Sequence, residues 1–153
     1  MRKSRAFKLL ANVCRLILAC TFIVSGFTKV IDPWGTAMKV NEYLSIYGME
    51  SLQGASMAFS IWLCGAEMMM GCMLLFKVRI RLISIFAVLS MLFFTALTLL
   101  SATVIPVEDC GCFGDAIKLT NFETLGKNII LLAISILLWR FPLQMVRFIS
   151  KPT

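Results

Sequence analysis

The chain has 153 residues, of which 59% are hydrophobic and only 15% are charged, and its formal net charge is +7. A soluble domain of this length could not bury so much apolar surface, so the composition indicates that lipid is the solvent. The basic residues lie in short groups between apolar runs and form no clustered basic face, which argues against nucleic-acid binding.

Four apolar segments are long enough to cross a membrane, at about residues 9–28, 55–76, 82–107 and 121–141. Roughly 20 apolar residues span the hydrocarbon core, so the fourth segment needs end residues that reach back to the interface. Ile17-Leu18-Ala19-Cys20 loosely resembles a lipoprotein cleavage site, but the apolar run continues to Phe27, which favours a retained helix. We expect an all-α bundle of four transmembrane helices that forms a single domain over residues 1–153.

The charged residues differ between the two ends of this bundle. One end collects most of the 15 basic residues and no acid: Arg2, Lys3, Arg5, Lys8, Arg15, Lys77, Arg79, Arg81, Arg140, Arg147 and Lys151. The other end mixes the remaining lysines with nearly all of the 8 acidic residues. The positive-inside rule therefore predicts that both termini are cytoplasmic and that the 31–54 and 108–119 loops lie outside.

The first outer loop contains a helix signal of its own. Asp32 can cap a helix that begins at Pro33, where the missing N–H of proline costs nothing. Apolar and polar residues alternate after it, and Trp34, Tyr43 and Tyr47 suit the headgroup level. We expect a short helix that lies in the membrane interface.

The second outer loop carries the pattern Cys110-Gly111-Cys112. A capping box, Thr120-Asn121-Phe122-Glu123, predicts that the following helix begins near Asn121. A disulfide across one intervening residue closes a strained ring that glycine tolerates, and such strain makes the bond easier to reduce. Cys110 and Cys112 are thus the candidate catalytic pair, with neither assigned as the attacking thiol.

Two other interpretations of this pair stay open. A structural disulfide between them would close too small a loop to stabilise much, and Cys64 is the nearest other candidate partner. A metal site would use sulfur ligands typical of Cu(I) or Zn, but the chain has no histidine, and Met68–Met70 occupies three faces of a helix. No metal is therefore assigned.

Glu67 needs an explanation because a carboxylate inside an apolar span is costly. It can act as a proton relay or ligand contact, or it can be a buried structural carboxyl paired with Lys29 or Lys127. Cys64, Glu67, Met68 and Gly71 share one helical face, which we expect to look into the bundle.

Several short patterns extend over nearly the whole chain: Ser25-Gly26-Phe27-Thr28-Lys29 followed by Asp32-Pro33, Glu67 with Gly71, Cys110-Gly111-Cys112-Phe113-Gly114, and Lys127-Asn128. Together they resemble the MauE branch of the MauE/DoxX family. The resemblance implies a small four-helix protein of the bacterial inner membrane that is linked to redox partners. It also implies a role in disulfide formation or maturation of exported proteins, including the disulfide-rich small subunit of methylamine dehydrogenase. Lys127 stands where the family commonly has arginine.

These observations predict a membrane protein that takes part in thiol–disulfide exchange with thioredoxin-like or other exported thiol proteins. Lys29 and Lys127 would favour a thiolate, and Asn128 and Cys64 join them and Glu67 as supporting residues. No cofactor motif is evident, although a quinone would be a suitable electron sink. The alternative is a non-catalytic membrane subunit, or an assembly or transport component, whose loop holds a partner.

Overall fold

The computed structural model describes residues 5–103 and 121–141, and every regular element in these two ranges is helical. The elements in chain order are α1 (Arg5–Ile31), α2 (Pro33–Ile46), the 3₁₀ helix η1 (Glu50–Ala55), α3 (Ser56–Leu75), α4 (Ile80–Thr103) and α5 (Asn121–Arg140). Among them, α1, α3 together with η1, α4 and α5 give four helical segments that are long and apolar enough to span a membrane. The expected all-helical architecture with four candidate spans is confirmed.

The helix bounds differ from the expected ones in two places. α1 is longer at both ends than 9–28, so Lys29 lies within the helix, one residue past the expected end. α4 starts at Ile80, which places Arg81 in its first turn rather than in the turn before it. α5 begins at Asn121 as predicted, whereas Thr120 of the capping box and the predicted end of α4 lie outside the described residues.

The start of α2 follows the local sequence closely. The Asp32 carboxylate accepts a hydrogen bond of 2.9 Å from the backbone N–H of Gly35, and Pro33 occupies the first helical position. The side chain thus satisfies one of the backbone donors that a helix start leaves unpaired. This confirms the predicted cap. α2 packs on α3, and Ser60 of α3 donates a hydrogen bond to the carbonyl oxygen of Pro33.

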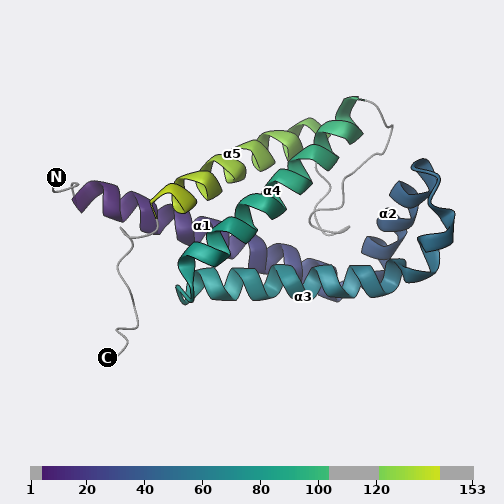
Figure 1. The fold of residues 1–153 in the computed structure, drawn as a ribbon, viewed down its shortest axis with the longest axis horizontal. Helices are drawn as coiled ribbons and strands as arrows, with labels where there is room; N and C mark the ends of the chain where they lie inside the picture. The colour runs from purple at the N-terminus through teal and green to yellow at the C-terminus, as the bar shows by residue number, and fades with distance from the viewer. Residues whose placement is uncertain (1–4, 104–120, 142–153) are drawn as a thin grey trace.

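The four long helices pack mainly as two pairs, α1 with α3 and α4 with α5, as the ribbon shows (Figure 1). Glycines allow the first pair to approach closely. A Cβ atom on Gly71 would lie 2.6 Å from Cγ1 of Ile23 and 2.9 Å from its backbone nitrogen, and one on Gly26 would lie 3.0 Å from the nitrogen of Met68. Small residues at such contacts are typical of helix pairs in membranes, because close backbone approach increases dispersion contact.

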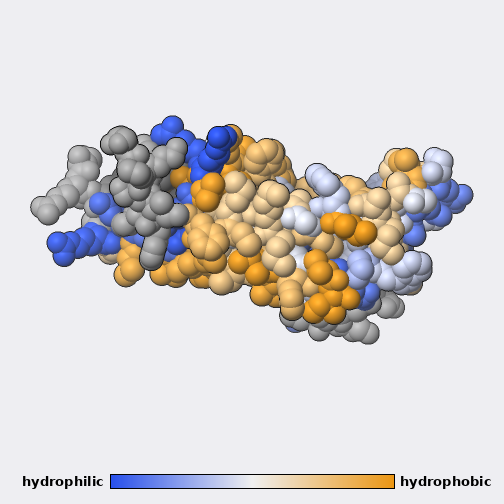
Figure 2. All heavy atoms as spheres, turned by 90° about the horizontal axis from the view of Figure 1, so that it is seen from below, coloured by the Kyte–Doolittle hydropathy of each residue, from blue (hydrophilic) through white to orange (hydrophobic). Residues whose placement is uncertain are grey.

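The surface changes character along the length of the molecule. Figure 2 shows an apolar belt across the middle of the face in view and hydrophilic residues gathered towards the two ends. The start of α1, the turn between α3 and α4, and the end of α5 lie at the same end of the molecule, whereas α2 lies towards the other end (Figure 1). The basic residues of the first group, such as Arg5, Arg79 and Arg140, therefore share one end, as the sequence predicted.

Arg15 lies deep in the bundle near this basic end. Its guanidinium is buried and donates hydrogen bonds of 2.6 and 2.8 Å to the carbonyl oxygens of Leu74 and Leu75. These carbonyls belong to the last turn of α3, where the backbone carbonyl oxygens have no N–H partner within the same helix. Arg15 of α1 thereby caps the C-terminus of α3. Burial and, to a smaller degree, the charge of Arg15 lower the pKa of Lys77 in the next turn.

Candidate functional site

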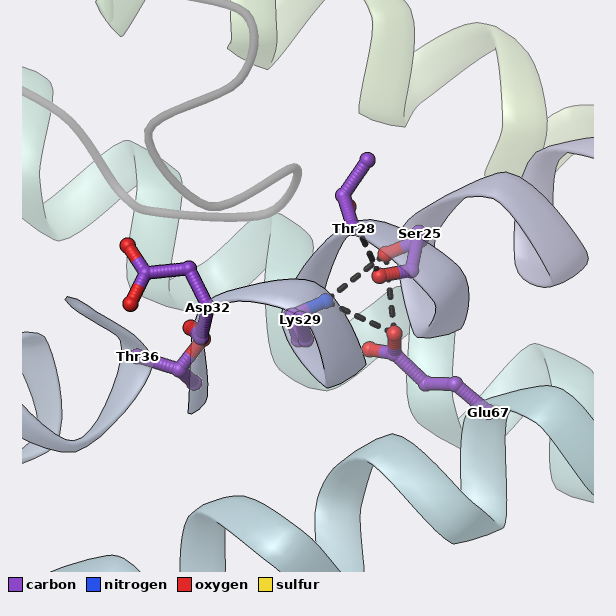
Figure 3. Close-up of polar contacts among 6 residues, drawn as sticks. All are labelled: Ser25, Thr28, Lys29, Asp32, Thr36 and Glu67. Atoms are coloured by element: carbon purple, nitrogen blue, oxygen red, sulfur yellow. Dashed lines mark hydrogen bonds and ion pairs between the residues drawn. The ribbon is translucent and has the colours of Figure 1, made fainter. Parts of the chain in front are cut away.

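A buried ion pair joins α1 to α3 in the interior of the bundle. The Lys29 ammonium lies 2.7 Å from Oε2 of Glu67, and the two side chains are 2% and 1% exposed. The Ser25 hydroxyl donates to the same carboxylate oxygen at 2.8 Å, and the Lys29 ammonium donates to the Ser25 oxygen at 2.7 Å. Figure 3 shows the three side chains converging, while the carboxylate of Asp32 points away from them.

The sequence explains why these side chains meet. Ser25 and Lys29 are four residues apart on α1, so they lie one above the other on the same helical face. Glu67 lies on the face of α3 that packs against α1, with Cys64 and Gly71, and all three are buried. Met68, the fourth residue of that predicted face, is half-buried. The prediction that this face looks into the bundle is confirmed.

The ion pair solves the problem that each charge would pose alone. An isolated charge within an apolar span is costly, and such residues usually pair with one another inside the bundle. Here Oε2 of Glu67 accepts hydrogen bonds from Ser25 and Lys29, and the ammonium of Lys29 also supplies the opposite charge. Of the two lysines considered for Glu67, Lys29 is the one that the structure places against it.

A second polar cluster connects α4 with α5. The buried amide of Asn128 donates to Oγ1 of Thr98 at 2.9 Å and lies 3.5 Å from the carbonyl oxygen of Phe94. Asn128 and Glu67 line one small cavity of about 20 Å³, with Thr21, Ser25 and Lys127 also in its wall. Oε1 of Glu67 is buried and has no hydrogen-bond partner among the described residues. A cavity of this size holds about one water molecule, which would give that oxygen a donor.

The expected site residues are thus brought together only in part. Glu67 and Lys29 are in contact, and Asn128 and Lys127 line the adjoining cavity. Cys64 is buried one helical turn from Glu67, with its carbonyl oxygen 3.2 Å from the Cβ position of Gly26. Cys110 and Cys112 lie outside the described residues, so the expected exchange pair stays a prediction.

Several residues of the polar interior, among them Ser25, Arg15 and Thr98, were not singled out from the sequence. Ser25 was noted only as part of a longer pattern, although its position four residues before Lys29 was a usable signal. Arg15 was counted among the basic residues of one end. Its position within an apolar run was the signal, because polar residues in membrane spans pair with backbone carbonyls or with each other.

Comparison with known proteins gives one finding about ancestry. The model of a family described as "Methylamine utilisation protein MauE" matches residues 7–141, which include all five α-helices almost completely. No curated protein and no solved structure gave a significant match.

Proposed function

Because the chain belongs to the MauE family, we propose that it exchanges thiols and disulfides with exported proteins through Cys110 and Cys112. The observation that carries the proposal is the placement of this pair in the sequence. It stands between α4 and α5, and the start of α5 and the end of α4 lie at the end of the molecule away from the basic residues (Figure 1). The family description supports a link to methylamine utilisation. In this proposal the partners of the protein are thioredoxin-like or other exported thiol proteins.

The charge asymmetry supports an orientation for this exchange. If the basic end faces the cytoplasm of a bacterial inner membrane, both termini are cytoplasmic and the Cys-Gly-Cys pair is periplasmic. α2 would then lie at the outer interface, with the exposed Trp34 and Tyr47 at headgroup level. Disulfides form and persist in that compartment, so the pair would be on the side where exchange is useful.

The buried cluster of Ser25, Lys29 and Glu67 has a supporting role in this proposal. Its charges are sealed inside the bundle, so it does not itself meet an exported protein. It fixes α1 against α3, and Glu67 also lines the water-sized cavity. In this proposal Glu67 is either a relay group that acts through a water in that cavity or a purely structural carboxyl, and the variants described in the Discussion separate the two roles.

Serine replacement of single cysteines tests the exchange. Attack by one thiolate gives a mixed disulfide that the second thiol resolves. We therefore expect one of Cys110→Ser and Cys112→Ser to accumulate a covalent complex with an exported partner, visible on non-reducing gels and lost with reductant. The double variant should trap nothing, and Cys20→Ser and Cys72→Ser should behave as wild type.

The same variants separate the main proposal from its alternative. A non-catalytic subunit that only holds a partner would mature its client normally with both cysteines replaced. Full client maturation in the double serine variant would therefore favour the subunit, and differential alkylation in cells would show whether the pair ever cycles between thiol and disulfide.

A further inference from the structure

A larger pocket lies between α2, α3 and α4, distinct from the water-sized cavity. It has a volume of about 280 Å³, and its walls are mostly apolar and aromatic, with Val40 and Tyr43 from α2, Phe59 and Leu63 from α3, and Phe94 and Leu97 from α4. Pockets of this composition bind small organic ligands, with a few polar groups that fix the orientation. The volume suits a substituted six-membered ring and leaves a longer tail outside.

The charged residues of the pocket wall favour a neutral ligand. Lys29 is paired with Glu67 at 2.7 Å, and Lys39 lies 3.8 Å from the carboxylate of Glu42. Each ammonium in the described wall is thus paired with a carboxylate, although neither Glu67 nor Glu42 lines the pocket itself. This pairing compensates the two positive charges, so the pocket favours a neutral molecule with acceptor oxygens over an anion.

Lys29 and Phe94 connect the pocket to the polar interior. The Lys29 ammonium lies 5.6 Å from the centre of the Phe94 ring, and both residues are part of the pocket wall. Phe94 also lines the water-sized cavity together with Glu67, whose Oε1 has no hydrogen-bond partner among the residues that the structure describes. A carboxyl, a lysine and space for one water therefore adjoin an apolar pocket.

Part of the pocket wall lies at the exposed surface of two candidate membrane spans. Phe59 and Phe93 both line it and are 42% and 51% exposed, and both belong to helices that are candidate membrane spans. A ligand dissolved in the membrane can thus enter without crossing water, and a long apolar tail can stay in the lipid.

We propose that this pocket binds a quinone, with its ring between the aromatic walls and its isoprenoid tail in the membrane. This inference rests on the proposed function. Oxidation of a dithiol breaks two S–H bonds, forms one S–S bond and releases two electrons and two protons, and reduction of a quinone to a quinol consumes the same numbers. A quinone is neutral and lipid-soluble and carries two acceptor oxygens, which are the properties that the pocket favours.

Photolabelling of the full-length protein in nanodiscs tests the site. An azidoquinone should label residues of 40–44, 59–63 or 93–97, and excess decylubiquinone should compete for this labelling. Val40→Trp should fill the pocket from α2 and weaken competition about tenfold, which corresponds to about 1.4 kcal/mol of binding free energy. Val30→Trp is the matched control, because Val30 is 55% exposed on α1 and is not part of the wall.

A second matched pair of variants distinguishes loss of the binding site from misfolding of a single variant. Leu97→Trp fills the pocket from α4, and Leu99→Trp places the same ring on the exposed face of that helix. The site would be wrong if decylubiquinone did not displace the label. It would also be wrong if the wall variants and their controls were labelled and competed equally. Loss of a tightly bound phospholipid from Val40→Trp, with quinone labelling unchanged, would overturn it in favour of a lipid.

The two proposals fail in different ways in these preparations. If mixed disulfides are trapped but quinone labelling is not competed, the pocket assignment is wrong and thiol exchange stands. If quinone labelling is competed but no single serine variant traps a partner, the pocket stands as a quinone site and the exchange proposal is wrong.

Discussion

At the scale of single residues, the interior of this bundle is organised by a few buried polar side chains. Lys29 and Ser25 both donate hydrogen bonds to Glu67, and Arg15 donates hydrogen bonds to two carbonyl oxygens of α3. Each would be costly in an apolar span without its partner. Arg15, Ser25 and Lys29 all belong to α1, so directed contacts hold α1 against α3 at two levels, at Arg15 and at Ser25 and Lys29.

The ion pair predicts the outcome of a double-mutant cycle. Glu67→Gln leaves the Lys29 charge buried without a counter-charge, and Lys29→Gln leaves Glu67 in the same state, so each should destabilise the protein by about 3–5 kcal/mol. The double replacement removes both charges and should recover a large part of that loss. Thermal unfolding in detergent measures all four proteins.

The cycle also distinguishes a structural pair from a proton-carrying one. A double variant that is stable but slow in exchange would assign Glu67 or Lys29 a part in proton movement, whereas stable and fully active protein would leave them only the structural role. A double variant no more stable than the worse single variant would contradict the pairing itself.

At the scale of helices, glycines allow α1 and α3 to approach each other closely. Gly71 of α3 faces Ile23 and Ala19 of α1, and Gly26 of α1 faces the backbone of α3 at Met68. This close approach brings Ser25 and Lys29 within hydrogen-bonding distance of Glu67. The helix pair and the polar cluster therefore depend on each other.

Two glycines of α3 provide a matched test of this contact. Gly71→Ala should destabilise the protein by about 1–3 kcal/mol, because the new methyl group would meet Ile23 at 2.6 Å and its backbone nitrogen at 2.9 Å. Gly65→Ala has open space around the new atom and should stabilise by about 0.5–1 kcal/mol through helix propensity. Equal effects of the two changes on unfolding temperature would show that α1 and α3 are not packed this closely.

At the scale of the whole molecule, the distribution of charge along the bundle indicates how it sits in a membrane. The basic residues at the start of α1, the α3–α4 turn and the end of α5 share one end, and the apolar belt separates them from α2 at the other (Figure 2). Four candidate spans return the chain to the side on which it started. The start of α1 and the end of α5 thus lie at the basic end of the bundle.

Reporter fusions test this orientation. Since basic residues favour the cytoplasmic side, green fluorescent protein fused after Thr153 should fluoresce, and alkaline phosphatase at the same position should be inactive. Alkaline phosphatase inserted after Leu119 should be active, because the segment between α4 and α5 would be external. The reverse pattern would place the cysteine pair in the reducing cytoplasm and remove the compartment argument for exchange.

The sequence by itself determined the elements whose causes are local. The apolar runs predicted the spans because lipid offers the backbone no hydrogen bonds, so any crossing segment must be a helix of sufficient length. Asp32 and Pro33 predicted the start of α2, and Asn121 the start of α5, because a cap acts over one turn. The shared face of Cys64, Glu67 and Gly71 followed from helical periodicity alone.

Only the tertiary structure decided which polar groups meet and where space remains. The choice of Lys29 over Lys127 for Glu67, the reach of Arg15 to Leu74, and the pocket between α2 and α4 all depend on how far each helix is rotated and shifted against its neighbours. In a membrane the outer face of a helix is as apolar as its inner face, so hydrophobic patterning does not report that rotation. Close contacts such as Gly71 against Ile23 fix it, and they exist only once the helices have packed.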